Sequence, residues 1–266
     1  MIRLDKYLAD MKVGTRSEVK EYIRKRRVSV DGEIVNSPET KIDIESQTVA
    51  LDGQTVGYVS KEYYMLNKPA GVLTATMDKK ARTVLDLIDG ARKDLFPVGR
   101  LDKDTEGLLL ITNDGRLAHE LLSPKKHVDK VYYARVRGSM GEKEINAFAA
   151  GLKVDEQLTA MPAKLEVLRV CRSSEVEPER TVSEVTERTV SKVSEGAVSE
   201  VIVTVHEGKF HQVKRMFLAA GSEVLYLKRL SMGTLKLDEN LTAGQYRALT
   251  KAELDELLGL VGMTAN

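Results

Sequence analysis

The chain has 266 residues, of which 42% are hydrophobic and 30% are charged, and its formal net charge is +1. This length and apolar content suit one medium-sized domain plus a small one. The single cysteine, Cys171, excludes an internal disulfide framework and a cysteine-rich metal site. No apolar run approaches the roughly 20 residues that span a bilayer, and the N-terminus lacks the apolar core of a signal peptide. We therefore expect a cytoplasmic protein that makes no membrane contact.

Residues 1–57 are predicted to form a small separate module. Leu4, Leu8 and Met11 recur at helical spacing, and the segment 15–18 has the pattern of a capping box that starts a second helix. The second helix would bury Val19 and Ile23 and expose basic side chains. These are Arg16, Lys20, Arg24, Lys25 and Arg26.

A hairpin is expected after these helices, because Asp31-Gly32 suits a tight primed turn between two short apolar segments. Two helices followed by the sequence 27–32 resemble the RNA-binding domain named after ribosomal protein four of the small subunit. Residues 1–30 contain nine Lys and Arg against four Asp and Glu, a net charge of +5. The resemblance implies that the basic helix face binds phosphates, although an ordinary solvated helix face accounts for the charge equally well.

The main domain is predicted to start near Glu62. A strand is expected at 63–67 and ends at the turn-forming segment 68–71. Further strands are indicated by apolar runs at 108–111, 131–136, 164–170, 201–205 and 224–227. Helical patterns appear at 115–122, 142–150, 211–220 and 250–258. This mixture predicts an α+β domain, spanning residues 62–260, with a largely antiparallel sheet.

Residues 172–200 contain a short repeat with a period of eight, rich in Ser and Glu and without aromatic residues. The composition suits a disordered loop, and the alternation of Val with polar residues suits a hairpin arm. We interpret this segment as an insertion without a catalytic role.

The segment 99–112 is the most informative part of the chain. An apolar run, 108–111, has the pattern of a buried strand, and a polar loop with Arg100, Asp102 and Asp104 precedes it. A carboxylate at the end of a rigid strand is well placed for chemistry. From composition alone, a solvated acidic turn is the simpler interpretation.

Arg100-Leu101-Asp102, followed by Thr105 and Gly107-Leu108-Leu109, resembles the signature loop of the pseudouridine synthases. The resemblance covers most of the chain. The extended form of this loop is similar to that of the ribosomal small-subunit branch of the family. It implies a mixed, largely antiparallel central sheet with the active site in a cleft across it. It also implies that Asp102 is the catalytic residue, that Arg100 contacts the RNA backbone, and that no cofactor is needed. Thr105 and Gly107 are expected to form the turn that positions Asp102, and Asp104 to shape the loop.

Three other segments carry the same resemblance. Lys68-Pro69 resembles a motif that braces the floor of the active site, and Lys130-Val131-Tyr132 resembles a strand motif. The strand motif implies that Tyr132 stacks on the target uracil and handles the leaving proton. A strand tyrosine with a core ring is the simpler alternative, and Tyr133 would face the other side of the sheet.

The third segment, 207–217, resembles the motif that supplies a basic partner for the catalytic carboxylate. Lys214 occupies that position, with Arg215 as the neighbouring alternative, and Lys209 and Arg215 are expected to contact RNA phosphates. His211 and Gln212 are not expected to bind a metal, because the four histidines show no paired spacing.

The resemblance implies an enzyme that isomerises a specific uridine of rRNA to pseudouridine, most simply in 16S rRNA. A relative acting on 23S rRNA is the alternative within the class, and a non-catalytic RNA-binding assembly factor is the alternative outside it. The expected partner is rRNA or a small-subunit assembly intermediate, and the protein is expected to be a monomer.

Overall fold

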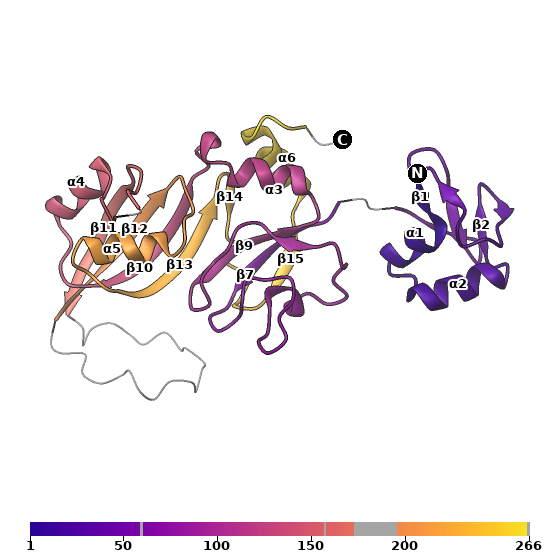
Figure 1. Cartoon of the computed structure of the whole chain (residues 1–266), viewed down its shortest axis with the longest axis horizontal. Coiled ribbons are helices and arrows are strands. Elements are labelled where there is room, and N and C mark those ends of the chain that lie inside the picture. The colour runs from indigo at the N-terminus through magenta and orange to yellow at the C-terminus, as the bar shows by residue number, and fades with distance from the viewer. Residues whose placement is uncertain (59–60, 157, 173–195, 265–266) are drawn as a thin grey trace. The chain divides into compact units, whose positions relative to one another are not determined.

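The computed structural model describes all residues except 59–60, 157, 173–195 and 265–266. The chain forms two compact units, Met1–Lys61 and Glu62–Asn266 (Figure 1). The smaller unit has one hydrophobic core, and the larger unit has two.

The N-terminal unit packs two helices against short strands. Helices α1 (Leu4–Asp10) and α2 (Arg16–Arg24) bury Leu4, Leu8, Val19 and Ile23 completely. The four-stranded sheet has the order β3-β2-β5-β6, and β1 pairs with β4. These strands are β1 (Ile2–Arg3), β2 (Val28–Val30), β3 (Glu33–Ile34), β4 (Lys41–Ile42), β5 (Val49–Leu51) and β6 (Gln54–Val56).

Local signals in the sequence of this unit are confirmed. Thr15 and Glu18 form both hydrogen bonds of the capping box, which fixes the start of α2. Asp31 and Gly32 have φ angles of 50° and 86°, as a primed turn requires, and they connect β2 to its antiparallel partner β3.

The larger unit is built on a nine-stranded sheet whose main path is β11-β12-β10-β13-β9-β7-β15, with β14 on β13 and β8 on β9. All pairings are antiparallel except that of β9 with β13. The mixed, largely antiparallel α+β architecture is therefore confirmed. The strands are β7 (Tyr63–Lys68), β8 (Phe96–Pro97), β9 (Glu106–Thr112), β10 (Lys130–Arg137), β11 (Lys164–Arg172), β12 (Ala197–Val205), β13 (Val224–Met232), β14 (Leu235–Lys236) and β15 (Tyr246–Ala248).

Helices cover this sheet in two separate groups (Figure 1). Helices α4 (Glu142–Ala150) and α5 (Gln212–Ala219) pack on the β10–β12 part through Phe148 and Phe217, whose rings lie 5.0 Å apart. Helices α3 (Gly115–Leu122) and α6 (Lys251–Leu260) pack on β7 and β9 through a second core. Two 3-10 turns, η1 (Val84–Leu87) and η2 (Pro124–Lys126), complete the unit.

The two parts of the sheet meet where β9 runs parallel to β13, with Gly107 opposite Arg229. A Cβ on Gly107 would lie 2.2 Å from the Arg229 carbonyl oxygen, and the φ angle of Gly107 is +97°. Gly107 therefore belongs to a strand and not to the expected turn. Glycine is required there because two backbones approach closely.

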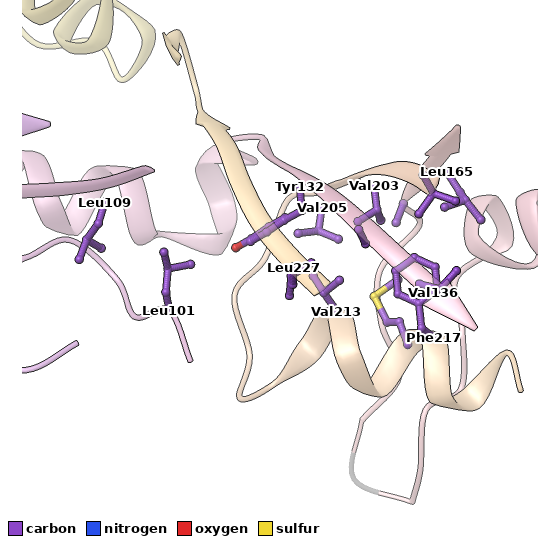
Figure 2. Close-up of a cluster of buried hydrophobic side chains, with 14 of the residues drawn as sticks. Leu101, Leu109, Tyr132, Val136, Leu165, Val203, Val205, Val213, Phe217 and Leu227 are labelled. Carbon is purple, nitrogen blue, oxygen red and sulfur yellow. The ribbon is translucent and has the colours of Figure 1, made fainter. Parts of the chain in front are cut away.

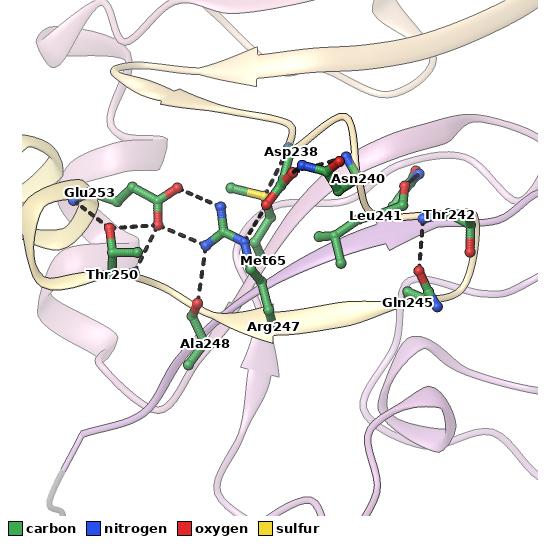
Figure 3. Close-up of polar contacts among 11 residues, drawn as sticks. Met65, Asp238, Asn240, Leu241, Thr242, Gln245, Arg247, Ala248, Thr250 and Glu253 are labelled. Atoms are coloured by element: carbon green, nitrogen blue, oxygen red, sulfur yellow. Dashed lines mark hydrogen bonds and ion pairs between the residues drawn. The ribbon is translucent and has the colours of Figure 1, made fainter.

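The C-terminal segments are held to this sheet by Arg247 of β15 (Figure 3). Its guanidinium donates to Asp238 at 2.7 Å and to both carboxylate oxygens of Glu253 on α6, at 2.8 and 2.7 Å. The Glu253 carboxylate also accepts the backbone N–H of Thr250, which caps α6. One side chain thus joins β15, the preceding loop and α6.

Most of the repetitive segment 172–200 lies outside the described residues, but its two ends do not. Arg172 is the last residue of β11, and Ala197–Glu200 belong to β12, with Arg172 opposite Ala197 in an antiparallel register. The described ends of the segment are thus parts of two paired strands, and the interpretation of the rest as an insertion stays a prediction. In the described part of the chain, no helix is long and apolar enough to cross a membrane.

Candidate active site

Asp102 lies in the loop between β8 and β9, and hydrogen bonds fix this loop from several sides. The Thr74 hydroxyl donates to the Leu101 carbonyl at 2.7 Å, and the Thr105 N–H donates to the Asp102 carbonyl at 3.1 Å. Leu101 anchors the loop in the core, where it is 6% exposed. The carboxylate of Asp102 is thus attached to a rigid backbone.

Lys68, at the end of β7, supports the same loop through hydrogen bonds to its backbone carbonyls. Its side chain is completely buried, and its ammonium donates to the carbonyls of Pro69, Lys103 and Thr105 at 3.0, 3.1 and 2.9 Å. Burial lowers the pKa of Lys68 to about 8, although nearby carboxylates, Asp104 foremost, oppose this shift. Three carbonyl acceptors satisfy the ammonium, so Lys68 serves as a structural support.

Two side chains from the start of α5 flank the Asp102 carboxylate. His211 Nε2 lies 3.4 Å from one oxygen, and Lys214 Nζ lies 3.4 Å from the other. Lys214 also contacts Asp104 at 2.5 Å. Burial raises the pKa of Asp104, but the hydrogen bond and charge of Lys214 outweigh burial, so the net shift is downward. The site therefore holds two carboxylates around one ammonium.

Tyr132 of β10 faces the same pocket. It is 8% exposed and packs among Val205, Val213 and Leu227, and Figure 2 shows its hydroxyl at the end of the cluster toward Leu101. Tyr133 lies on the other side of the sheet, with its ring 6.0 Å from that of Tyr226. The strand therefore directs Tyr132 and not Tyr133 into the pocket, as predicted.

The pocket is lined by the loop before β9, by strands β10 and β12, and by the start of α5. Apolar and charged side chains both line it. Its lining includes Arg100, Leu101, Asp102, Thr105, Tyr132, Val205, Glu207, Lys209, His211, Gln212, Val213, Lys214 and Leu227. An aromatic ring, a fixed carboxylate and a cation that line one pocket suit a planar polar ligand such as a nucleobase.

Residues 62–219 match the family model described as RNA pseudouridylate synthase, and residues 2–56 match that of the S4 domain. The chain belongs to the RNA pseudouridylate synthase family. The synthase is 41% identical, over 95% of its length and 97% of the relative, to the uncharacterized RNA pseudouridine synthase YtzG of Bacillus subtilis (strain 168). It is 36% identical, over 95% and 97% of the two chains, to ribosomal small subunit pseudouridine synthase A of Yersinia pestis.

A solved crystal structure of a pseudouridylate synthase matches this chain with a TM-score of 0.60 and 33% identity. The match covers 97% of the synthase and all of the other chain. The likeness therefore extends over both units and includes the segments that line the pocket.

The basic residues predicted to contact RNA lie in different surroundings. Arg100 and Lys209 line the pocket of the synthase, and Lys209 pairs with Glu207 at 2.9 Å. Arg215 points elsewhere, because it forms an ion pair with Asp155. Lys214 is thus the basic partner of Asp102.

The remaining candidates for RNA contact belong to α2 and the residues just after it. Lys20 is half-buried, and Lys25 pairs with Glu21 at 2.6 Å. The exposed candidates are Arg16, Arg24, Lys25 and Arg26.

The motifs did not predict that His211 lies beside Asp102. His211 was considered only as a metal ligand, yet it adjoins Asp102 and has a left-handed backbone, with φ of 49°. Its neighbour Gln212 bonds to the buried carboxylate of Glu207 at 2.8 Å, which fixes the loop before α5. The position of His211 directly before Gln212 in the third motif was the available signal.

Within the part of the chain that the structure describes, no three His, Cys, Asp or Glu side chains gather as metal ligands would. His206 instead lies beside Asp129, with Nδ1 2.7 Å from a carboxylate oxygen, and its ring is 6.1 Å from that of His127. Neither histidine lines the pocket.

Proposed function

We propose that the protein isomerises a uridine of 16S rRNA to pseudouridine, with Asp102 as the catalytic residue. The observation that carries this proposal is the position of the Asp102 carboxylate, fixed between His211 and Lys214 in a pocket that also holds Tyr132. The small-subunit target is supported by relatives named ribosomal small subunit pseudouridine synthase A, at 34–36% identity, from several bacteria.

The proposed reaction breaks the bond between ribose C1′ and uracil N1 and forms one between C1′ and C5. The proton leaves C5, and N1 regains a proton, so no atom is gained or lost. Asp102 acts at the sugar–base bond, either by attack on a carbon or by removal of a ribose proton, and both are chemistry that a carboxylate performs. The Lys214 ammonium lies 3.4 Å from this carboxylate, close enough for a direct electrostatic interaction with the reacting group.

Tyr132 is proposed to stack on the extruded uracil and to assist removal of the C5 proton. Its ring belongs to the buried apolar cluster that includes Val205, Val213 and Leu227, and Figure 2 shows its hydroxyl at the end of that cluster toward Leu101. Because a stacked base cannot be reached within RNA, the uridine must leave its helix at a cost of a few kcal/mol. Base stacking on an aromatic ring returns roughly 1–3 kcal/mol.

The N-terminal unit is proposed to hold rRNA through the basic face of α2, because phosphate contacts orient an enzyme without reading sequence. The proposal also includes a cytoplasmic monomer that acts on free rRNA or on a small-subunit assembly intermediate. Light scattering of the purified protein, alone and with RNA, tests whether it is a monomer in solution.

The decisive experiment combines mapping with one substitution. Pseudouridines in 16S and 23S rRNA are mapped with and without the gene, and purified protein is assayed on both transcripts. Asp102→Asn preserves shape and removes the charge, so it should abolish turnover while RNA affinity stays within a few-fold. Normal turnover by this variant would refute the role of Asp102. Loss of a 23S pseudouridine alone would transfer the proposed target to that RNA.

A further inference from the structure

Phe210 presents an exposed aromatic ring beside the active-site pocket. Two of the other three phenylalanines, Phe148 and Phe217, are completely buried, whereas Phe210 is 73% exposed. Its chain neighbours Lys209 and His211 both line the pocket. A ring this exposed contributes little to the core, and its place beside a pocket makes it available for contact with a ligand.

The Phe210 ring continues the active site outward. It stacks on the His211 imidazole, with ring centroids 3.8 Å apart and planes inclined by 18°. His211 in turn lies 3.4 Å from the Asp102 carboxylate. Two parallel rings therefore extend from the carboxylate to the protein surface.

The backbone holds this stack in a defined place. His211 adopts a left-handed conformation at the start of α5, which is uncommon for a residue other than glycine. Hydrogen bonds from the Lys209 N–H to Gln212 at 2.9 Å and from Arg215 to the Phe210 carbonyl at 3.3 Å fix the backbone on both sides. Backbone strain of this kind is retained mainly at functional sites.

We propose that Phe210 is a stacking platform for an unpaired RNA base next to the uridine in the pocket. This inference rests on the proposed function, because it requires an RNA whose target base has been extruded. Extrusion leaves a neighbouring base without its stacking partner, and a protein ring replaces that partner at low entropic cost. Phe210 thereby acts as a positioning residue for the reaction.

The surroundings of Phe210 favour RNA over a protein partner. Arg100 and Lys209 are cationic and line the same pocket as His211, on which the Phe210 ring stacks. A single ring among charged side chains does not form the contiguous apolar patch that protein interfaces need. A nucleotide offers a flat aromatic base that can stack on the ring and a phosphate that can contact the cationic side chains.

The first test compares Phe210→Leu with Phe210→Tyr in single-turnover assays on 16S rRNA transcript over a range of enzyme concentrations. Phe210→Leu should raise the half-saturating concentration about tenfold or more and leave the plateau rate within a few-fold, while Phe210→Tyr stays near wild type. Melting temperatures should not change, because the ring is exposed. Wild-type saturation by Phe210→Leu would overturn the proposal.

The second test does not depend on turnover. The chain has no tryptophan, so Phe210→Trp introduces the only indole. Binding of single-stranded oligouridylate should quench its fluorescence, whereas Leu168→Trp, at a 55% exposed position on β11, should respond little. Equal quenching in the two variants, or none in Phe210→Trp, would overturn the platform.

The same Phe210→Trp variant separates RNA from protein as the partner. Iodide should quench the indole efficiently in RNA-free protein, and RNA should protect it. Protection before RNA is added would show that protein covers this face and would overturn the proposal. If wild-type protein forms no pseudouridine in 16S rRNA, the proposed function fails, and the fluorescence titration still decides the role of Phe210.

Discussion

The ammonium of Lys214 contacts the carboxylate of Asp104 at 2.5 Å, closer than its 3.4 Å approach to Asp102. The side chain of Asp104 is 75% exposed, whereas that of Asp102 is 22% exposed. Water screens the first pair strongly, and the second pair lies in the pocket where charges act more strongly. We therefore expect Asp104 to hold the lysine in place and Asp102 to be the carboxylate on which the lysine charge acts in the reaction.

This arrangement predicts unequal effects of two substitutions. Lys214→Met should lower the single-turnover rate by about 10²-fold or more, because Asp102 loses its cationic partner in a partly buried site. Asp104→Asn should lower the rate only a few-fold, since Lys214 stays beside Asp102. Rates are measured at saturating enzyme, so that weaker RNA binding does not contribute. A larger loss in Asp104→Asn than in Lys214→Met would mean that Asp104 is the essential carboxylate.

The two proposed roles of Tyr132 can be separated by removing its groups in turn. Tyr132→Phe keeps the ring, so RNA affinity should remain near wild type while proton removal slows by about 10²-fold or more. Tyr132→Leu also loses the stacking surface, so affinity should fall together with the rate. A binding titration alongside single-turnover kinetics tests both expectations. The matched control is Tyr133→Phe, which lies on the other face of the sheet and should leave both quantities unchanged. Wild-type rates in Tyr132→Leu would exclude this residue.

Much of the fold follows from local signals. The capping box at Thr15 fixes a helix start through hydrogen bonds within four residues, and the apolar run 108–111 becomes the fully buried centre of β9. The approach of β9 to β13 at Gly107 could not be predicted in this way. The close contact joins segments about 120 residues apart, and nothing near Gly107 in the sequence shows which backbone lies against it.

Residues of the site could be predicted from the sequence where a motif assigns a single role to a single position. Asp102, Tyr132 and Lys214 were named from three separate segments, and the fold brings them to one pocket. Arg215 and His211 show the limit of that reasoning. Both adjoin motif positions, but Arg215 turns toward Asp155 and His211 toward Asp102. The direction of a side chain at a helix start depends on the local backbone, which the motif does not specify.

The basic face of α2 predicts a salt-dependent contribution to RNA binding. Neutralising Arg24, Lys25 and Arg26 to glutamine should weaken binding and reduce the slope of log affinity against log salt by up to about 0.7–0.9 for each lost phosphate contact. The plateau rate of the reaction should change little, because these residues lie outside the pocket. Filter binding over a series of salt concentrations measures the slope.

The control for this prediction uses two cations of the same unit that both have carboxylate partners, as Lys25 of the triple variant also does. Lys6 pairs with Asp10 at 2.6 Å, and Arg27 forms an ion pair with Asp52. Replacing Lys6 and Arg27 by glutamine should alter the slope less than the triple substitution does. An unchanged slope in the triple variant would indicate that the basic face of α2 is only solvated.

The contact between Arg247 and Glu253 predicts how stability depends on pH (Figure 3). The two hydrogen bonds from Arg247 lower the pKa of Glu253 from 4.5 to about 2, against an opposing effect of burial. Because the pKa is lower in the folded state, this stabilisation is fully present above pH 4.5 and is lost as the pH falls toward 2. A shift of this size corresponds to about 3 kcal/mol, which solvent screening reduces to about 1–2 kcal/mol.

Glu253→Gln should therefore lower the free energy of unfolding by about 1–2 kcal/mol at pH 7, and its difference from wild type should shrink below pH 4.5. Urea unfolding at several pH values measures this difference. Glu256→Gln, an exposed position on the same helix, should have no comparable effect. A difference between wild type and Glu253→Gln that stays constant from pH 7 to pH 3 would show that the carboxylate contributes packing and not charge.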